Sequence, residues 1–425
     1  MTKNIKAEII TIGDELLIGQ VIDTNSAWIA RELNSIGIVV AQITSISDTQ
    51  DQIINSLTAA SERVNLVLVT GGLGPTNDDI TKIAINEYFN THFIKNQQVL
   101  NHIEKLLFNR GLPMNRLNIA QADVPEKATI LPNSLGTAPG LWLEHNKIIY
   151  VFMPGVPYEM KSIFSNELIP QIKNQFSGPS IFHKTLMLYG IAESVLALRI
   201  EEWESSLPST IKLAYLPSLG TIRLRLTAMG EANSKLEDLI SFEVKKLLPL
   251  IKDYYFGNDD ETLEIVVGKL LKDNNKTVAT AESCTGGTVA GLLTSNSGSS
   301  AFFKGGIIAY SNEVKTSVLK VDESILHNYG AVSEQVVRVM AEETLELMQV
   351  DYSVSVSGVS GPDGGTPEKP VGTVWIGIAS KNSVHAVKFN FENDRARNIK
   401  RAANAALNEL RKMILSDIEK KHIIV

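Results

Sequence analysis

The residues with the clearest chemical potential lie in ATAESCTGG, residues 279–287, where an apolar run meets a helix start rich in small residues. A hydroxyl or thiol at such a corner projects above a sheet, and the amides that follow it could hold a phosphate or a developing oxyanion. Ser283 and Cys284 therefore compete as nucleophiles. A reactive cysteine needs a paired base such as histidine, and none lies near in the sequence. We therefore favour a small, buried structural role for Cys284.

A serine nucleophile also needs a base, and YSNEVK, residues 310–315, offers a phenol in Tyr310 and an amine in Lys315. A lysine whose pKa falls from about 10.4 toward about 7–8, through burial or a nearby cation, can serve as that base. A lysine at such a helical position is in most proteins a solvated surface residue. The residues alone therefore leave both interpretations of Lys315 open.

A second segment, SGVSGPDGG at residues 357–365, runs on through KPVGTVW at residues 369–375. So much glycine and proline between two predicted strands favours a binding loop over a simple connection. Arg395 and Arg397 open the last predicted helix, where an arginine could bind a phosphate. Ordinary solvated charge is the alternative interpretation for both arginines.

Two acidic loops follow predicted strands in the first third of the chain: GDE at residues 13–15 and TGGLGPTNDD at residues 70–79. Ligands of open parallel sheets lie beyond the carboxyl ends of strands, where glycines let backbone amides approach a phosphate. The spacing is neither a Walker A loop nor GxGxxG. Carboxylates beside a phosphate suit a bridging Mg²⁺, which prefers hard oxygen ligands. Asp78 and Asp79 could equally just cap their helix.

Alternating strands and helices must position these first loops. The strands are predicted at Ala7–Ile12, Ile38–Ile46, Val64–Val69 and Ile148–Phe152, and the helices at Asn25–Ile36 (capped by Thr24 or Asn25), 48–62, Asp78–Phe89 and Gln97–Arg110. Strands joined by helical crossovers form a parallel sheet with helices on both faces. We therefore predict an α/β fold, with a doubly wound domain at residues 1–174.

A smaller α+β domain is predicted at residues 180–255, with the order β-α-β-β-α. Arg223 and Arg225 alternate with leucines there, which indicates a solvated strand face or a phosphate contact. The GxxG loop with which KH domains clamp nucleic acid is absent. Tyr254–Asp260 resembles a linker, and a third, α/β domain is predicted at residues 260–425. Its elements are predicted at 262–272, Thr277–Ala281, 285 onward, Gly306–Tyr310, 312–319, Ser333–Met348, Tyr352–Ser357, Val371–Ala379, Val384–Phe391 and Asp394–Ile418.

Composition narrows the class of protein. The 425 residues carry 40 Lys+Arg against 47 Asp+Glu, a net charge of −7, which argues against a dedicated nucleic-acid binder. A single Cys excludes a disulfide framework and fits a reducing compartment. No Cys/His pair has zinc spacing, and neither a signal peptide nor an apolar run of membrane-spanning length is present. We therefore expect a cytoplasmic, multidomain protein with no membrane contact and no direct nucleic-acid binding.

Four motifs in the first domain, TIGDELLIGQVIDTN, TGGLGPTNDD, NSLGTAPG and MPGVPYEM, resemble the molybdopterin-binding fold of the CinA family of competence/damage-inducible proteins. The resemblance implies a metal-dependent ADP-ribose pyrophosphatase that uses Mg²⁺ or a similar divalent cation. It places substrate contacts on Asn25, Gly71, Gly72 and Gly74, and metal ligands on Asp14, Glu15, Asp78 and Asp79. The middle domain is similar to the KH-like insert of long CinA proteins.

The motifs ATAESCTGG, GGIIAYSNEVK, GAVSE, SGVSGPDGG, KPVGTVW and NDR closely resemble the CinA C-terminal domain. That resemblance implies a nicotinamide-nucleotide amidase, which converts nicotinamide mononucleotide to nicotinate mononucleotide and ammonia without a cofactor. It assigns catalysis to Ser283, Tyr310 and Lys315. Substrate contacts would fall on Thr285, Gly286, Gly287, Ser357, Gly358, Gly361 and Arg395. The family pattern often has Gly where this chain has Asn393, a departure next to the arginine.

Taken together, the resemblance implies a bifunctional, homodimeric enzyme of pyridine-nucleotide salvage, with nicotinamide mononucleotide and ADP-ribose as its ligands. Two alternatives belong to other classes. The N-terminal fold alone would fit a molybdopterin-binding or cofactor-assembly protein, but the intact amidase motifs count against that. A non-catalytic, competence-linked protein that binds a protein partner is the other alternative, because acidic charge does not argue against protein partners.

Overall fold

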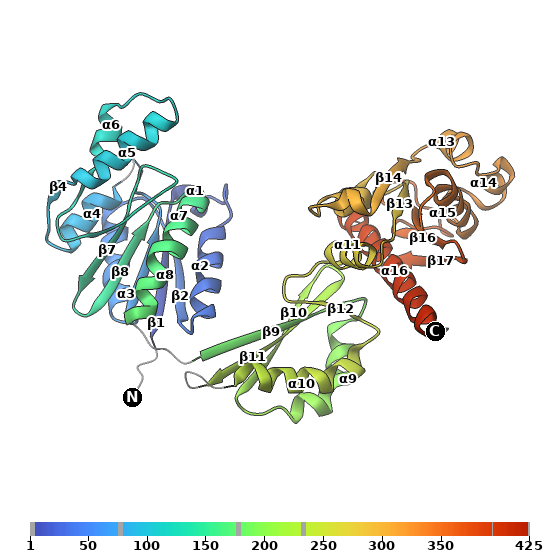
Figure 1. The fold of residues 1–425 in the computed structure, drawn as a ribbon, viewed down its shortest axis with the longest axis horizontal. Coiled ribbons are helices and arrows are strands. Elements are labelled where there is room, and N and C mark those ends of the chain that lie inside the picture. Colours follow the sequence, from blue (N-terminus) through green and yellow to red (C-terminus); the bar gives the residue numbers. More distant parts are fainter. Residues whose placement is uncertain (1–4, 75–79, 176–179, 231–234, 393, 424–425) are drawn as a thin grey trace. The chain divides into compact units, whose positions relative to one another are not determined.

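The computed structural model describes residues 5–74, 80–175, 180–230, 235–392 and 394–423. The chain forms two compact units, one of residues 1–182 with 228–239 and the other of residues 183–227 with 240–425. Figure 1 shows the elements of each unit along the chain, and each unit is described by itself. Among the described residues, no helix is both long and apolar enough to cross a membrane.

The N-terminal domain has a six-stranded sheet in the order β2-β1-β3-β8-β7-β6. Its strands are β1 (Lys6–Ile12), β2 (Val39–Ile46), β3 (Leu66–Thr70), β6 (Thr129–Leu131), β7 (Gly140–His145) and β8 (Ile148–Met153). The four predicted strands β2, β1, β3 and β8 are parallel, whereas β7 and β6 pair antiparallel and were not predicted. The α/β fold is confirmed, with an antiparallel edge added to the parallel sheet.

Helices cover both faces of this sheet, because the buried residues of its strands alternate between two cores. Ala7 and Ile9 belong to one core and Ile10 and Ile12 to the other. The first core receives α2 (Thr24–Ser35), α7 (Pro157–Ile163) and the π-helical Phe164–Leu168, and the second receives α3 (Gln50–Ser61) and α4 (Thr81–Tyr88). The remaining elements are α1 (Asp14–Leu17), β4 (Phe93–Lys95), α5 (Gln97–Asn109), α6 (Arg116–Ala120), β5 (Asp123–Pro125) and α8 (Ile169–Gln175).

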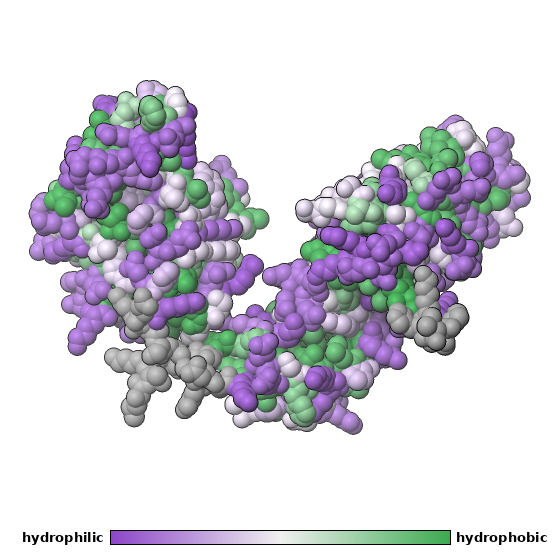
Figure 2. Space-filling view, viewed as in Figure 1, coloured by the Kyte–Doolittle hydropathy of each residue, from purple (hydrophilic) through white to green (hydrophobic). Residues whose placement is uncertain are grey.

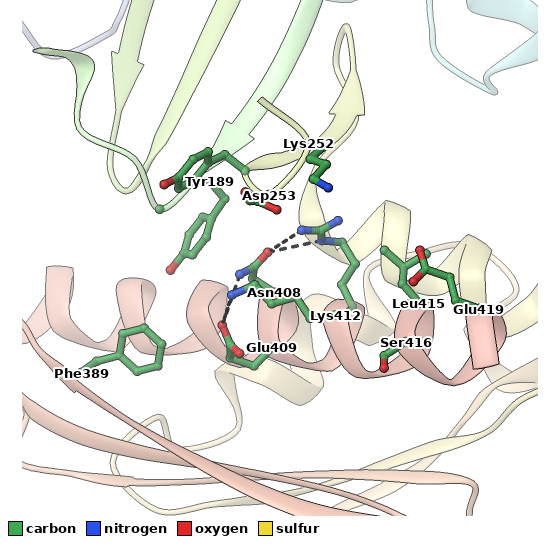
Figure 3. A pocket seen from close by; sticks show the side chains of 13 residues that line it. Tyr189, Lys252, Asp253, Phe389, Asn408, Glu409, Lys412, Leu415, Ser416 and Glu419 are labelled. Atoms are coloured by element: carbon green, nitrogen blue, oxygen red, sulfur yellow. Dashed lines mark hydrogen bonds and ion pairs between the residues drawn. The ribbon is translucent and has the colours of Figure 1, made fainter. Parts of the chain in front are cut away.

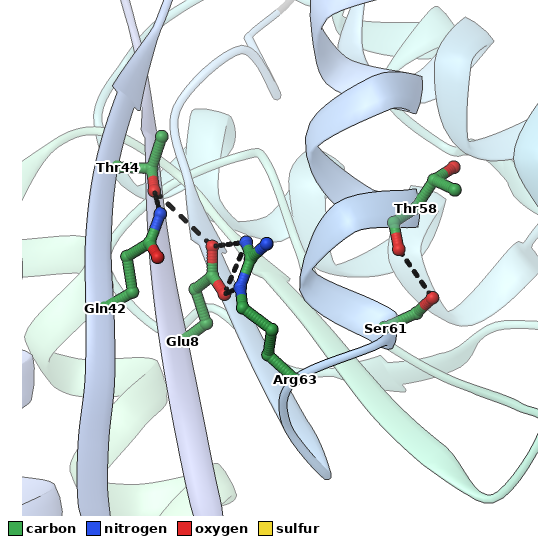
Figure 4. Close-up of polar contacts among 6 residues, drawn as sticks. All are labelled: Glu8, Gln42, Thr44, Thr58, Ser61 and Arg63. Atoms are coloured by element: carbon green, nitrogen blue, oxygen red, sulfur yellow. Dashed lines mark hydrogen bonds and ion pairs between the residues drawn. The ribbon is translucent and has the colours of Figure 1, made fainter.

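Two polar details of this domain differ from or add to the sequence interpretation. Helix α2 is capped by Asp23, whose carboxylate accepts the Ser26 amide at 2.9 Å, and not by Thr24 or Asn25 as predicted. Glu8 is 1% exposed in the middle of β1 and is paired with Arg63, whose Nη2 lies 2.9 Å from Glu8 Oε1 (Figure 4). The ion pair compensates for burying a carboxylate in an otherwise apolar strand.

The middle domain is a four-stranded sheet in the order β10-β11-β9-β12 with two helices. Its elements are β9 (Ser180–Tyr189), α9 (Glu193–Ser205), β10 (Ile211–Ser218), β11 (Thr221–Gly230), α10 (Leu236–Ile251) and β12 (Tyr255–Asn258). The linker prediction for Tyr254–Asp260 is wrong, since β12 lies there and pairs antiparallel with β9. Tyr255 and Phe256 favour a strand, but the polar residues that follow β12 led to the linker prediction. Arg223 and Arg225 are exposed, as a solvated strand face predicts.

The C-terminal domain has a five-stranded sheet in the order β14-β13-β15-β16-β17. Strands β14, β13 and β15 are parallel, and β16 and β17 run antiparallel to their neighbours. The bounds are β13 (Val278–Glu282), β14 (Phe303–Ile308), β15 (Tyr352–Gly358), β16 (Thr373–Ser380) and β17 (Ser383–Asn390). The helices are α11 (Leu263–Asp273), α12 (Thr288–Thr294), α13 (Asn312–Ser317), α14 (Glu323–Tyr329), α15 (Glu334–Met348) and α16 (Arg395–Ile423), with a 3₁₀ turn at Ser299–Ala301.

This sheet also lies between two helical layers. Val336 and Met340 of α15 share a core with Ala281 of β13, whereas α11, α12 and α16 contribute to a second, larger core. That larger core includes Met187 of β9 and Phe256 of β12, so the middle and C-terminal domains share one hydrophobic core. Hydrophilic residues are interspersed with smaller hydrophobic areas over the visible surface (Figure 2).

Candidate active site

Three parallel strands bring the predicted amidase residues together at one edge of the C-terminal sheet. Ser283 directly follows β13, Tyr310 lies two residues after β14, and Gly358 ends β15. Because these strands are parallel neighbours, their carboxyl ends meet at the same edge. Glu282 at the end of β13 and Val356 of β15, 74 residues apart in the sequence, are paired side by side in this way.

The amine of Lys315 lies against the hydroxyl of Ser283. The Nζ–Oγ distance is 3.2 Å, and the same Nζ donates to the main-chain oxygens of Ala309 at 2.8 Å and Tyr310 at 3.3 Å. Lys315 is only 1% exposed, so the interpretation as a surface helix residue is wrong. The short helix α13, capped by Ser311, turns this side chain inward beneath the end of β14.

The surroundings of Lys315 favour a neutral amine. Burial lowers the pKa of Lys315, and the opposing effects of Cys284 and of the exposed Glu313 carboxylate are smaller. The hydrogen-bond partners of Nζ are a hydroxyl and main-chain carbonyls, and none is a carboxylate. A neutral amine donates two N–H bonds, to the carbonyls, and its lone pair can accept the Ser283 proton. The arrangement provides a base within hydrogen-bond reach of a nucleophile.

Cys284 is 8% exposed and belongs to the large hydrophobic core. Burial raises the pKa of its thiol to about 11, so the thiol stays protonated near neutral pH. Its location agrees with the structural role that the sequence favours.

The amides after Ser283 are less free than the sequence suggests. The Gly286 amide donates to the main-chain carbonyl oxygen of Ser283 at 3.1 Å, and the Gly287 amide donates to Glu282 Oε2 at 3.0 Å. Both glycines adopt positive φ, which lets the chain turn sharply here. The prediction that all three amides could serve an oxyanion or a phosphate is therefore wrong for these two. Of the three, only the amide of the buried Thr285 has no acceptor within the described part of the chain.

Glu282, which was not predicted from the sequence, holds this corner. Its carboxylate is 1% exposed and accepts the amides of Gly287, Val289 and Ala290 at 3.0, 3.0 and 2.8 Å. These amides are donors at the start of α12 that lack an acceptor within the helix. The available signal was an acidic residue at the end of a fully buried strand, where a charge needs a dedicated partner.

The Gly- and Pro-rich loop closes the site from the side of β15. Ser357 donates to the Ala331 oxygen at 2.7 Å, which ties the strand end to the segment before α15. A Cβ on Gly361 would lie 2.4 Å from Val371 Cγ1, so only glycine fits there without a shift. Gly358 is similarly close to Val374. The fully buried Asn398, also missed, donates to the Ser360 oxygen at 3.0 Å and anchors the loop to α16.

Arg395 joins this loop to Tyr310. Its Nη1 donates to the Gly361 oxygen at 2.8 Å and its Nη2 donates to the Tyr310 hydroxyl at 3.2 Å. The sequence offers the Tyr310 phenol beside the Lys315 amine, and the resemblance assigns both residues to catalysis. The main-chain oxygen of Tyr310 does contact Lys315, but its phenol, 60% exposed, bonds Arg395 instead. Arg397 is exposed and pairs with Asp394, consistent with solvated charge.

These side chains surround an open cavity of about 240 Å³. Its lining includes the predicted Ser283, Tyr310, Lys315, Ser357, Gly358 and Arg395, together with Cys284, Asn312, Ala331, Val332 and Ser360. A hydroxyl, an amine and a guanidinium therefore line one cavity.

The N-terminal site is described only in part, because Asp78 and Asp79 lie outside the described residues. Gly71 has φ 118°, and a Cβ there would lie 2.2 Å from the Ile12 oxygen, so the loop requires glycine. Gly72 also has positive φ and faces Thr81, while Gly74 is half-buried. The glycine-rich turn therefore follows β3 closely beside the end of β1.

Oxygen donors flank this turn. Asp14 and Glu15 are exposed just after β1. Asn25 donates to the Gly155 oxygen at 2.7 Å, and its buried Oδ1 has no hydrogen-bond partner among the described residues. Within the described residues, no three His, Cys, Asp or Glu side chains are grouped so that they could hold a metal ion.

Comparisons with known proteins cover nearly the whole chain. Residues 8–174 match the model of a probable molybdopterin binding domain, residues 183–257 that of the damage-inducible protein CinA KH domain, and residues 260–414 that of the CinA C-terminal domain. A CinA-like protein from Cytophaga hutchinsonii is 47% identical over 97% of this chain and 99% of its own length. Another from Flavobacterium psychrophilum is 46% identical over 98% of this chain and 100% of its own. The crystal structure of competence/damage inducible protein CihA from Agrobacterium tumefaciens is 34% identical over 35% of this chain and 92% of its own, with a TM-score of 0.35.

Proposed function

The chain belongs to the CinA family, and from this premise we propose that its C-terminal domain is a nicotinamide-nucleotide amidase. The observation that carries the proposal is the contact between the buried Lys315 amine and the Ser283 hydroxyl at 3.2 Å. Ammonia release from nicotinamide mononucleotide by the purified full-length protein, lost in Ser283→Ala, tests it. An inactive wild-type protein would contradict the proposal.

In the acylation half of the reaction, Ser283 Oγ attacks the carboxamide carbon while Lys315 accepts the hydroxyl proton. The resulting tetrahedral intermediate carries an oxyanion, which the Thr285 amide is free to stabilise. The C–N bond then breaks, and the proton held by Lys315 leaves with the amine as ammonia. An ester between Ser283 and the nicotinate group remains.

In the deacylation half, water attacks the ester carbon and gives a proton to Lys315. The ester C–O bond breaks, and Lys315 returns the proton to Ser283 Oγ. Nicotinate mononucleotide is released and the enzyme is restored. The amine thus exchanges one proton with each leaving group, which requires a pKa low enough for both directions, as its burial favours.

Arg395 supplies the positive charge for the phosphate of the nucleotide. It lies at the rim of the cavity, exposed, and its contacts to Gly361 and Tyr310 fix the guanidinium above the site. Guanidinium groups bind phosphate oxygens in a two-pronged geometry. Tyr310 therefore acts in substrate positioning through Arg395, and its main-chain oxygen orients the Lys315 amine.

A second activity, metal-dependent hydrolysis of ADP-ribose to AMP and ribose 5-phosphate, is proposed for the N-terminal domain. The strict glycine at position 71, the unpartnered Oδ1 of Asn25 and the carboxylates of Asp14 and Glu15 support it. Such oxygen donors suit Mg²⁺, which would neutralise charge on the pyrophosphate. Asp14 and Glu15, with Asp78 and Asp79, would hold the ion. Formation of AMP from ADP-ribose, measured with and without added Mg²⁺, tests this activity.

A further inference from the structure

A cavity of about 570 Å³ lies within the second compact unit, away from the residues that line the Ser283 site. One wall consists of the end of β9 and residues 252–254 of the middle domain, and the other of helix α16 with Phe389 of β17 (Figure 3). Its volume is within the range of pockets that hold small organic ligands. The two walls are fixed to each other, because Met187 and Phe256 share a hydrophobic core with Leu407 and Leu410 of α16.

The wall formed by α16 contains a buried arginine that forms no ion pair within the described part of the chain. Arg411 is 6% exposed, and its guanidinium donates to Asn408 Oδ1 at 3.1 and 3.3 Å and to the Tyr255 oxygen at 3.2 Å. All of these acceptors are uncharged. Burial lowers the pKa of Arg411, the charge of nearby Glu409 opposes this effect, and the guanidinium itself forms no ion pair among the described residues.

The neighbouring carboxylate is already occupied. Glu409, 8% exposed, accepts Lys412 Nζ at 2.7 Å and the Asn408 side-chain amide at 3.4 Å (Figure 3). Asn408 therefore links the two charged groups while it holds the guanidinium in a fixed orientation. Three of the five N–H bonds of Arg411 have acceptors, which leaves two for a ligand.

The rest of the lining indicates the kind of ligand. Lys412 is already paired with Glu409, whereas the exposed Lys252 adds a second positive charge to that of Arg411, and two cations match a doubly charged phosphate better than a single carboxylate. Asp253 and Glu419 are exposed acceptors suited to hydroxyl groups. Burial and the charge of Glu409 raise the pKa of Tyr189, so its phenol stays protonated and can donate.

From this arrangement we infer that the cavity between the middle domain and α16 is a second binding site, for a small hydroxylated organic phosphate, with Arg411 as its anion ligand. The site is separate from both proposed reactions, since none of its lining residues lines the Ser283 cavity or the glycine-rich turn after β3. A ligand there would contact both domains that share the core and so stabilise their packing.

Hydrogen exchange of the full-length protein, with and without ribose 5-phosphate, tests the inference at the level of individual peptides. We expect protection of residues 252–258 and 405–419, with binding at least about tenfold weaker in Arg411→Met. Ser416→Trp fills the cavity without altering Arg411 and should weaken binding similarly, which covers the case in which Arg411→Met fails to fold. Lys400→Met removes an exposed charge of the same helix outside the cavity and should bind as wild type does.

Three outcomes would overturn the inference. The first is no protection of these two segments in the wild-type protein. The second is unchanged protection in a folded Arg411→Met or Ser416→Trp variant. The third is protection by citrate at equal ionic strength without protection by ribose 5-phosphate, which would replace the phosphate by a polycarboxylate. Because the readout is local, loss of amidase or pyrophosphatase activity would not affect it.

Discussion

Replacing Lys315 by methionine keeps the length and apolar stem of the side chain and removes only the amine. The Nζ–Oγ distance of 3.2 Å places that amine at the edge of the range for direct proton transfer. A positioned general base contributes about 10²–10⁴ in rate. We therefore expect Lys315→Met to lower kcat for ammonia release from nicotinamide mononucleotide by about that factor, or about 3–5 kcal/mol in the barrier.

Two further variants separate a base from a positive charge. Lys315→Arg keeps a cation that does not deprotonate, so it should be as slow as Lys315→Met. Because Ser283 and Lys315 share one proton in the proposed reaction, the double variant Ser283→Ala/Lys315→Met should be little slower than either single variant. Lys320→Met, which removes an exposed amine on the same domain, is the matched control and should retain full activity.

The pH dependence gives an independent readout. Since burial lowers the pKa of Lys315, the wild-type rate should rise with pH through an apparent pKa below the usual value of about 10.4, and Lys315→Met should lack that rise. The contribution of Lys315 to the folding stability also increases with pH. Between the lowered folded-state pKa and the unfolded-state pKa, the unfolded chain binds more protons, so the stability of the wild-type protein relative to Lys315→Met should rise with pH. An active Lys315→Arg variant, or strictly additive losses in the double variant, would refute the assignment of Lys315 as the base.

Four other outcomes are expected. Cys284→Ala should keep amidase activity within about tenfold, and a folded variant that loses about 10³ or more would make Cys284 the nucleophile. In Glu282→Gln, the side-chain N–H₂ group would face backbone N–H groups that in the wild type donate to the carboxylate. We therefore expect kcat to fall with little change in KM. Glu282→Asp keeps the carboxylate and should restore part of the rate. Arg395→Gln should raise KM for nicotinamide mononucleotide about tenfold or more, and a selective fall in kcat would argue against a phosphate contact. Asp78→Ala or Asp79→Ala, and likewise a chelator, should abolish ADP-ribose cleavage while ammonia release stays near wild type; parallel loss of both activities would indicate unfolding or a shared metal requirement.

Much of the fold could be predicted because its strands are short apolar runs separated by helical periodicity. The parallel strands of both sheets lie within a few residues of their predicted bounds. The antiparallel edge β6–β7 was missed because Gly140 and the preceding small residues indicate a loop, whereas cross-strand pairing with β8 and burial of Trp142 determine the strand. Likewise, β12 is a strand because it pairs with β9, whose residues lie 67 to 72 positions earlier in the chain, and no local pattern shows this pairing.

The sequence predicted which residues form the candidate site, but not how deeply they are buried or which groups they contact. Lys315 is expected on a helix from its sequence, yet its burial depends on the end of β14 passing over it. The Glu282 carboxylate accepts the Gly287 amide, so this amide is not available to a ligand. The sequence does not show this contact, because the side chain of a strand residue can also face solvent. The contact between the Tyr310 phenol and Arg395 joins residues 85 positions apart and follows only from the folded loop. The spacing of residues in the sequence indicates the chemistry of the site, whereas the hydrogen-bond partners of these residues can be identified only from the tertiary structure.

The shared core of the middle and C-terminal domains also bears on how the chain unfolds. Residues of β9 and β12 are covered by α16, and α16 in turn covers the sheet that carries Ser283. Separating the two domains would expose apolar surface on both, so we expect their unfolding to be coupled. Deletion of the middle domain would therefore expose part of the apolar surface of α16, which packs on the sheet that carries Ser283. The middle domain has no GxxG loop, and its packing against α16 contributes to the folding stability of the C-terminal domain.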